Sequence, residues 1–441
     1  MPAPLSKLLG CLRLSTRRTP ASKAVDSSSS STEFDEKHHQ PSRTQTDTLK
    51  LPETQQALLL HGIRQPYQLH SDQTVPKVRR DAPHELLVRT SVIGINPIDW
   101  KAPDYNFGVP ELPRQENALP GDHVLAIATD YRDLRKAAYQ QFPIANAHNV
   151  ARIPPSLSGE AAASIGVAFV AAALSLGICT GLDFSSVCDG PDLLKLVRDA
   201  GPALLPEDIR EECLTGIDLK DRLSKGDWVA VWGGSSTSAY MIYQLARLVG
   251  VKTISVLDVR KHSDWIYGDD SEFQKADVVV DSHDPARAVE IVRAVGASDP
   301  SGRLRFGIDT VGKTTAAELL KCMTPAPTEP AGEQQSSSLA TTTSTSSSEA
   351  RSTHLVGLTG LPKRDSTNDT TTKFHTVPIK LFHEVPEVGE ALMAWLERLL
   401  AEGLLKSPRI LAVEEGLESV NGVLDRMRKG EISGGRAVVR V

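Results

Sequence analysis

An alternation of apolar runs and amphipathic segments starts at Asp227, and it limits the fold of this chain more than any other feature. The run 228–232 (WVAVW) is continuously apolar, as in strands that are buried on both faces. A turn of small residues follows, and then a helix whose apolar face holds Met241, Ile242, Leu245 and Leu248. The order repeats, with strands at 253–257, 278–280, 304–308 and 354–358 and helices at 285–295 and 314–322. This predicts an α/β fold with a doubly wound parallel sheet.

The residues before this alternation follow another pattern. Segments 85–95 (ELLVRTSVIGI) and 124–128 (VLAIA) are typical of strands, which predicts a small β-rich domain. Ser158 can cap a helix that runs into an uncharged stretch, residues 161–182. That stretch is long enough to cross a bilayer. Its Ala, Gly and Ser content and its globular flanks favour a buried helix, so we predict no membrane span.

Two segments have the composition of disordered chain. Residues 1–53 begin with a basic, acid-free stretch and continue into a serine run. The beginning is typical of a mitochondrial presequence, so a cytoplasmic and a mitochondrial location both stay open. Residues 325–353 are rich in Pro, Ser and Thr, and we expect a disordered insertion there.

Composition excludes several classes of function. The net charge of −6 argues against a nucleic-acid partner. The five cysteines are scattered and no pair has the spacing of metal ligands, so we predict neither a metal site nor a disulfide framework. With 441 residues the chain is long enough for two domains.

The turn after the first parallel strand is the most informative motif. A dinucleotide pyrophosphate requires a close approach of the backbone and donor groups at a helix N-terminus. Six residues provide them here: Gly233, Gly234, Ser235, Ser236, Thr237 and Ser238. The match to G-x-G-x-x-G is loose, because Ala239 replaces the last glycine. We predict a dinucleotide site, and a tight turn without a ligand is the alternative.

The end of the second strand gives conflicting signals about the cofactor. Asp258 suits the ribose hydroxyls of NADH, whereas Arg260 and Lys261 suit the 2′-phosphate of NADPH. A solvated loop would also explain the basic pair.

Taken together, the motifs resemble the medium-chain dehydrogenase/reductase superfamily, above all its zinc-free quinone-oxidoreductase and fungal trans-acting enoyl-reductase branch. The likeness runs from Thr54 to Val441. It rests on the segments 94–101 (GINPIDWK), 104–108 (DYNFG), 110–113 (PELP), 121–124 (GDHV), 126–136, 233–238, 309–312 (DTVG), 355–361 and 429–434 (KGEISG). Asn96 stands where zinc-dependent members have a catalytic cysteine, so the resemblance implies no zinc.

The resemblance also implies an architecture and a chemistry. A GroES-like domain would form from residues 54–165 and 381–441, with a Rossmann domain, residues 166–380, between them. NADPH would bind in the cleft, with NADH as the open alternative, and a hydride would pass to a quinone or a conjugated carbonyl of a small-molecule substrate. Whether the chain forms a homodimer is left open.

Individual roles follow from the same resemblance. Lys101 would approach the cofactor, residues 235–238 would hold its phosphates, and Arg260 with Lys261 would meet the 2′-phosphate. The nicotinamide side would be flanked by Thr310, Val311, Leu358 and Thr359, and closed by Val438 and Val439. Tyr105 is the candidate proton donor, with a packed loop aromatic as the competing interpretation.

One segment departs from the family. Residues 114–119 connect Pro113 directly to Pro120, where the family has about two further strands. Either the gene model is wrong at this point or the GroES-like domain is truncated. A second hypothesis follows, that the chain is a catalytically impaired cofactor-binding homologue acting as a sensor or a partner protein.

Overall fold

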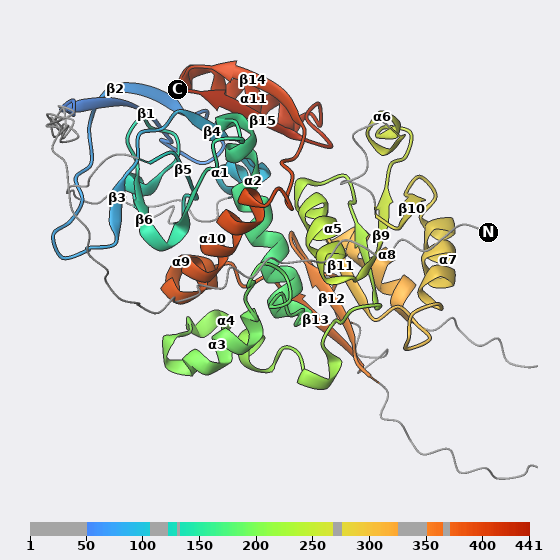
Figure 1. Ribbon diagram of the computed structural model, residues 1–441. Helices are drawn as coiled ribbons and strands as arrows, with labels where there is room; N and C mark the ends of the chain where they lie inside the picture. Colours follow the sequence, from blue (N-terminus) through green and yellow to red (C-terminus); the bar gives the residue numbers. More distant parts are fainter. Residues whose placement is uncertain (1–50, 106–121, 130–132, 268–275, 325–350, 365–370) are drawn as a thin grey trace, which may run out of the picture. The chain divides into compact units, whose positions relative to one another are not determined.

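Six parallel strands form the central sheet in the order β10-β9-β8-β11-β12-β13 (Figure 1). Their bounds are β8 Trp228–Trp232, β9 Lys252–Leu257, β10 Val278–Asp281, β11 Phe306–Asp309, β12 Thr353–Gly357 and β13 Thr372–Thr376. The strand order reverses between β8 and β11, as in the doubly wound Rossmann sheet. The predicted fold class is confirmed.

This computed structural model describes residues 51–105, 122–129, 133–267, 276–324, 351–364 and 371–441. Contacts divide the chain into Met1–Leu51 and Pro52–Val441, and every described helix and strand belongs to the second unit. The N-terminal segment, residues 114–119 and most of the 325–353 insertion lie outside the described residues. The predictions made for them, and the exact domain boundaries, stay predictions.

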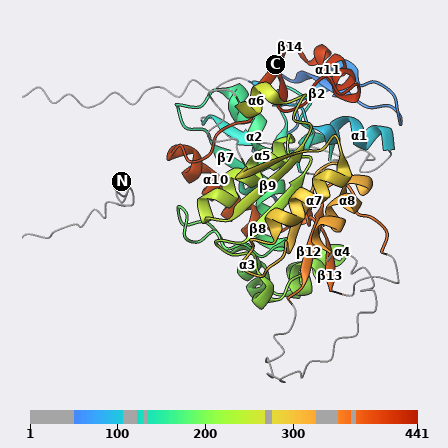
Figure 2. The same ribbon diagram turned by 90° about the vertical axis from the view of Figure 1, so that its right-hand side faces the viewer.

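Both faces of the central sheet are covered by helices (Figure 2). Val229 and Val231 of β8 belong to the core cluster that contains α5 (Thr237–Val249). Ala230 and Trp232 belong to the cluster on the other face, with α7 (Pro285–Gly296) and α8 (Lys313–Met323). Alternate side chains of one strand therefore enter two cores, which explains why the run 228–232 is apolar at every position.

The expected strand 85–95 is wrong as a single element. The structure has two short strands there, β3 Glu85–Leu87 and β4 Val92–Gly94. β3 pairs with β6 (Ile144–Asn146), whereas β4 pairs with β15 (Arg436–Arg440). The four residues between them carry the chain from one sheet to another, a change that the side-chain pattern does not record.

Strands from distant parts of the sequence share the sheet β14-β15-β4, with β14 at Ile410–Glu415. β15 is its central strand, parallel to β14 and antiparallel to β4. Two smaller antiparallel pairs complete the described β structure on this side: β1 (Thr54–Leu59) with β2 (Gln68–Thr74), and β5 (Val124–Ala126) with β7 (Val150–Arg152).

The long apolar helix α2 links the two parts of the unit. It spans Gly159–Leu174 and continues as a π-helix over Ser175–Cys179. As expected, the Ser158 hydroxyl caps it by accepting the N–H of Ala161 at 3.2 Å. By length and composition this helix could cross a membrane, but 83% of its most apolar window is buried. It packs against α5 and against β4 and β15, as a core helix does.

The remaining helices are α1 Pro97–Tyr105, α3 Leu193–Ala200, α4 Glu207–Thr215, α6 Ser263–Tyr267, α9 Lys380–Glu384, α10 Pro386–Ala401 and α11 Val420–Arg428. The sequence patterns assigned no element to α3, α4 or β13.

Candidate cofactor site

The turn after β8 has no room for a side chain at its two glycines. Gly233 has a positive φ of 84°, which favours glycine. A Cβ on Gly233 would overlap the Thr310 hydroxyl and lie 2.5 Å from a methyl of Val311. A Cβ on Gly234 would overlap the Ser255 hydroxyl and lie 2.7 Å from that of Tyr243. The backbone is therefore pressed onto β9, α5 and the loop after β11.

Hydrogen bonds within the protein already use the N–H groups of both glycines. Each donates to the carbonyl of Val256, at 3.0 Å from Gly233 and 2.9 Å from Gly234. The Ser236 hydroxyl caps α5 by accepting the N–H of Ala239 at 3.1 Å. The donors available to a phosphate are therefore not the N–H groups of the two glycines. The remaining donors are the hydroxyls of residues 235–238 and the N–H groups of Thr237 and Ser238, the first two residues of α5, which have no partner inside the helix.

The loops after β11 and β12 meet this turn at the carboxyl edge of the sheet. The Thr310 hydroxyl donates to the carbonyl of Gly233 at 2.9 Å, and the N–H of Leu358 donates to the carbonyl of Asp309 at 2.9 Å. Val311 is 52% exposed, so its side chain is available to a ligand. The structure therefore brings together Gly233, Thr310 and Val311, and it places Leu358 and Thr359 beside the loop after β11, all predicted from the sequence.

The carboxylate of Asp309 shapes the loop after β11. One of its oxygens accepts the N–H groups of Val311 at 2.9 Å and Gly312 at 2.7 Å. The residue is fully buried, and burial raises the pKa of this carboxyl. The loop beside the glycine turn is thus fixed from within.

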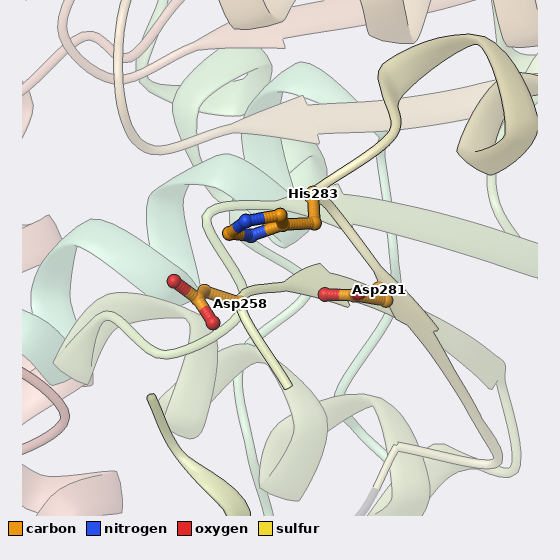
Figure 3. Close-up of side chains that lie close together, drawn as sticks. All are labelled: Asp258, Asp281 and His283. Carbon is orange, nitrogen blue, oxygen red and sulfur yellow. The ribbon is translucent and has the colours of Figure 1, made fainter. Parts of the chain in front are cut away.

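A second group of polar side chains lies at the ends of β9 and β10. Asp258 accepts the N–H of Lys261 at 2.9 Å, which lowers the pKa of Asp258; the nearby His283 and His262 lower it further. Asp281 accepts the N–H of Val259 at 3.1 Å. Figure 3 shows the imidazole of His283 beside both carboxyl groups, and these three residues offer ligand atoms within 4.8 Å of one another.

Asp281 and His283 were missed by the sequence analysis. The signal was present, because the rule that selected Asp258 at the end of one parallel strand applies equally to the end of its neighbour. Exposed carboxylates often gather without an ion, so this spacing alone does not indicate a metal site.

The basic residues after β9 are both exposed. The Lys261 ammonium donates to the carbonyl of Gly430 at 3.4 Å, and the next residue, His262, lies 3.5 Å from the Ser433 hydroxyl. The loop that carries Arg260 therefore touches the segment 429–434, which the resemblance had singled out.

The residues predicted on the GroES-like side lie on α1 and β15. Lys101 stacks over Trp100, with its ammonium 5.8 Å from the ring centre. Val438 and Val439 are fully buried within the protein, so the structure gives their side chains a packing role. Contacts of these three with a cofactor stay predictions.

The competing interpretation of Tyr105, a packed aromatic in a loop, does not agree with the structure. It is the last residue of α1 and is 65% exposed, 6.4 Å from Trp100 between ring centres. Its role as a proton donor stays a prediction.

Asn96, which the resemblance places at the position of a zinc-binding cysteine, is held by its neighbours. Its N–H donates to Asp99 at 2.7 Å and its side-chain amide donates to the carbonyl of Gly94 at 2.9 Å. Burial raises the pKa of Asp99 to about 6.

Comparisons with known proteins agree with this arrangement, although no family model matches the chain. A trans-enoyl reductase of Aspergillus sclerotiorum is 25% identical over 403 residues, covering 84% of this chain and 96% of that relative. A zinc-type alcohol dehydrogenase-like protein of Schizosaccharomyces pombe is 23% identical over 380 residues, covering 81% and 92%.

Solved structures share the fold. A mycobacterial protein complexed with NADPH matches with a TM-score of 0.57 at 17% identity, over 88% of this chain and 100% of that one. A putative NADPH:quinone reductase of Bacillus thuringiensis matches with a TM-score of 0.59 at 15% identity, over 88% and 99%. The chain is thus similar in sequence, over most of its length, to trans-enoyl reductases, and its Rossmann strand order and fold are shared with solved quinone oxidoreductases.

Proposed function

We propose that this protein is an NADPH-dependent, zinc-free oxidoreductase that reduces a quinone or an α,β-unsaturated carbonyl. The observation that carries the proposal is the cradle at Gly233 and Gly234, where two residues without side chains bring the backbone to the carboxyl edge of the sheet. Relatives named as enoyl reductases and structural neighbours named as NADPH quinone reductases support the same chemistry.

The residues present fit a dinucleotide. The hydroxyls of Ser235, Thr237 and Ser238 lie where α5 begins, so they and the helix N-terminus would hold the pyrophosphate. Thr310, Val311 and Leu358 would line the nicotinamide side. The bound cofactor supplies the hydride, and the protein contributes binding, orientation and exclusion of water.

A turnover assay tests the proposal. We expect the purified full-length protein to consume NADPH, followed by its absorbance, with a quinone or with an enoyl thioester. The rate should be unchanged by a metal chelator, because Asn96 replaces the zinc-binding thiol. Loss of activity on chelation would contradict the zinc-free assignment.

The second candidate, a cofactor-binding protein without catalysis, is favoured by the short connection at residues 114–119. It predicts that NADPH binds, as measured by quenching of protein fluorescence, but that neither substrate class is reduced. If the protein binds neither NADPH nor NADH, both candidates fail.

We expect Arg260→Ala to weaken NADPH binding by about ten- to a hundredfold and to leave NADH nearly unaffected. A charge-assisted hydrogen bond to a phosphate contributes roughly 1.5–3 kcal/mol, and about 1.4 kcal/mol is a factor of ten. Lys261 is already directed to the Gly430 carbonyl, which leaves Arg260 as the better-placed cation. Fluorescence titration with both dinucleotides measures the effect.

Arg287→Ala is the matched control, because Arg287 is an exposed arginine on α7 that pairs with Glu290 at 2.7 Å. It should leave both affinities unchanged. Equal weakening of the two cofactors by Arg260→Ala, or a wild type that prefers NADH, would reverse the assignment in favour of Asp258.

A further inference from the structure

The charges at the ends of β9 and β10 present a contradiction for an NADPH site. Two carboxylates, Asp258 and Asp281, lie at the sheet edge where the adenosine ribose binds in Rossmann folds. A 2′-phosphate carries about −1.5 to −2 charges near neutral pH. Both carboxylates would repel it, and the exposed Arg260 and Lys261 have to offset that repulsion.

His283 stands between these opposing charges. Its ring lies beside both carboxyl groups, with ligand atoms of all three residues within 4.8 Å (Figure 3). Histidine gains or loses its charge between about pH 5 and 8. When neutral it adds no charge beside the two carboxylates, and when protonated it adds a cation and a further N–H donor at the same place.

We propose that His283 and Asp281 determine how strongly this protein distinguishes NADPH from NADH, and that protonation of His283 increases the preference for NADPH. The inference rests on the proposed function. It names two specificity-determining residues beyond the basic pair, and it assigns the preference to a balance of charges that changes with pH.

The other charged groups around His283 set the direction of the effect. Asp258 follows β9, Asp281 ends β10 and Asp284 caps α7, so three carboxylates belong to the elements around His283. Arg260, Lys261 and His262 follow in the loop after β9 and are the basic groups of this region. His262 is 7% exposed, and burial lowers its pKa, so it contributes less charge than an exposed histidine.

Asp281 has a second effect through the backbone. Its carboxylate accepts the N–H of Val259, the residue that precedes Arg260, and so fixes the start of the basic loop. Asparagine at this position keeps an acceptor oxygen and removes the charge. Asp281→Asn therefore separates repulsion of the phosphate from placement of the loop.

The experiment compares the dissociation constants of NADPH and NADH between pH 8 and pH 6, with chelator present to exclude metal ions. The 2′-phosphate itself titrates near pH 6, so each pH profile is compared with that of His283→Gln, which cannot gain a charge. We expect the NADPH preference of the wild type to rise by about tenfold relative to His283→Gln as the pH falls, the worth of one charge-assisted hydrogen bond.

Asp281→Asn should raise NADPH affinity at pH 8 and leave NADH affinity unchanged. His123→Gln, a change at an exposed histidine preceding β5, should keep the wild-type profile. If the wild type and His283→Gln have the same pH profile, the inference is overturned while NADPH binding stands. If the wild type binds neither dinucleotide, the proposed function fails and the inference with it.

Discussion

Gly234→Ala is expected to cost about 3 kcal/mol of folding free energy and to abolish most of the NADPH affinity. The added methyl would overlap the Ser255 hydroxyl, which accepts a hydrogen bond from Tyr243 at 2.8 Å inside the core. The turn cannot move away, because the N–H groups of Gly233 and Gly234 are bonded to the carbonyl of Val256. Overpacking costs about 1–3 kcal/mol, and a broken buried hydrogen bond adds about 1–3 kcal/mol.

The structure changes the physical reason for this sensitivity. From the sequence alone, Gly234 was expected to be needed for a close approach of the backbone to the pyrophosphate. In the structure the position faces β9 and α5, so a small apolar substituent already suffices to disturb the turn. Urea unfolding and NADPH titration measure the two effects.

Gly422→Ala is the matched control for Gly234→Ala. Gly422 is exposed in α11, and a Cβ there meets nothing within 4 Å. Alanine in a helix is favoured over glycine by about 1 kcal/mol, so this variant should be slightly more stable than the wild type. Ser255→Ala should recover part of the stability lost by Gly234→Ala, since it removes the nearest colliding atom. Equal stability of Gly234→Ala and the wild type would contradict the geometry of the turn.

Lowering the pH from 8 to 5 is expected to destabilise the fold by about 2 kcal/mol through one buried histidine. Burial lowers the pKa of His354 from 6.5 to about 2. Below pH 6.5 the unfolded chain therefore binds a proton at His354 that the folded chain does not bind. The contribution of His354 to the free energy of unfolding is therefore fully present above pH 6.5. It is lost as the pH falls below that value, by about 1.4 kcal/mol per pH unit.

The surroundings of His354 explain why it stays neutral. Its Nδ1 lies 2.9 Å from Nε2 of His375, whose Nδ1 lies 2.7 Å from the Glu212 carboxylate. The remaining nitrogen of His354 is buried without a hydrogen-bond partner among the described residues. If Nδ1–H of His375 donates to Glu212, then Nε2 of His375 accepts a hydrogen bond from Nδ1–H of His354. Nε2 of His354 then carries a lone pair without a hydrogen-bond partner among the described residues. A further proton would place an unpaired N–H in the core.

His354→Phe tests this prediction, because phenylalanine can keep the stacking on Phe306 and cannot titrate. The free energy of unfolding of this variant should fall less between pH 8 and 5 than that of the wild type, whatever its absolute stability. The exposed His123→Gln variant should keep the wild-type slope. If the free energy of unfolding changes with pH in the same way in His354→Phe and in the wild type, acid destabilises the fold through groups other than His354.

Local patterns predicted the parts of the fold that local physics dictates. Strands β8–β12 and helices α5, α7 and α8 follow from apolar runs and helical periodicity. β13 was missed because its sequence, TKFHT, is polar, and it becomes a strand by pairing with β12. Arg305 could not be placed either. An arginine normally lies at the surface, yet this one is fully buried beside Asp221 and Asp227.

The candidate site was predicted where it depends on position along a strand. The glycine turn, Asp258 and Thr310 all follow strand ends, and parallel strands bring their ends to one edge. Which hydrogen bonds the turn uses internally depends on the register of β9 against β8, which no local pattern gives. The same holds for His283, because its position beside Asp258 depends on the pairing of β10 with β9.

The sheet β14-β15-β4 also has a consequence for how the protein is made. β4 is synthesised early, but its partner β15 comes some 340 residues later, after every strand of the Rossmann sheet; the bond from Arg436 to Ile95 spans 341 residues. Chains fold from the N-terminus during synthesis. Until β15 arrives, β4 exposes unpaired backbone groups and the apolar Ile93, which in the finished protein is 4% exposed. During translation this strand is therefore an open edge of the kind that promotes aggregation, and we expect chaperones to be needed there.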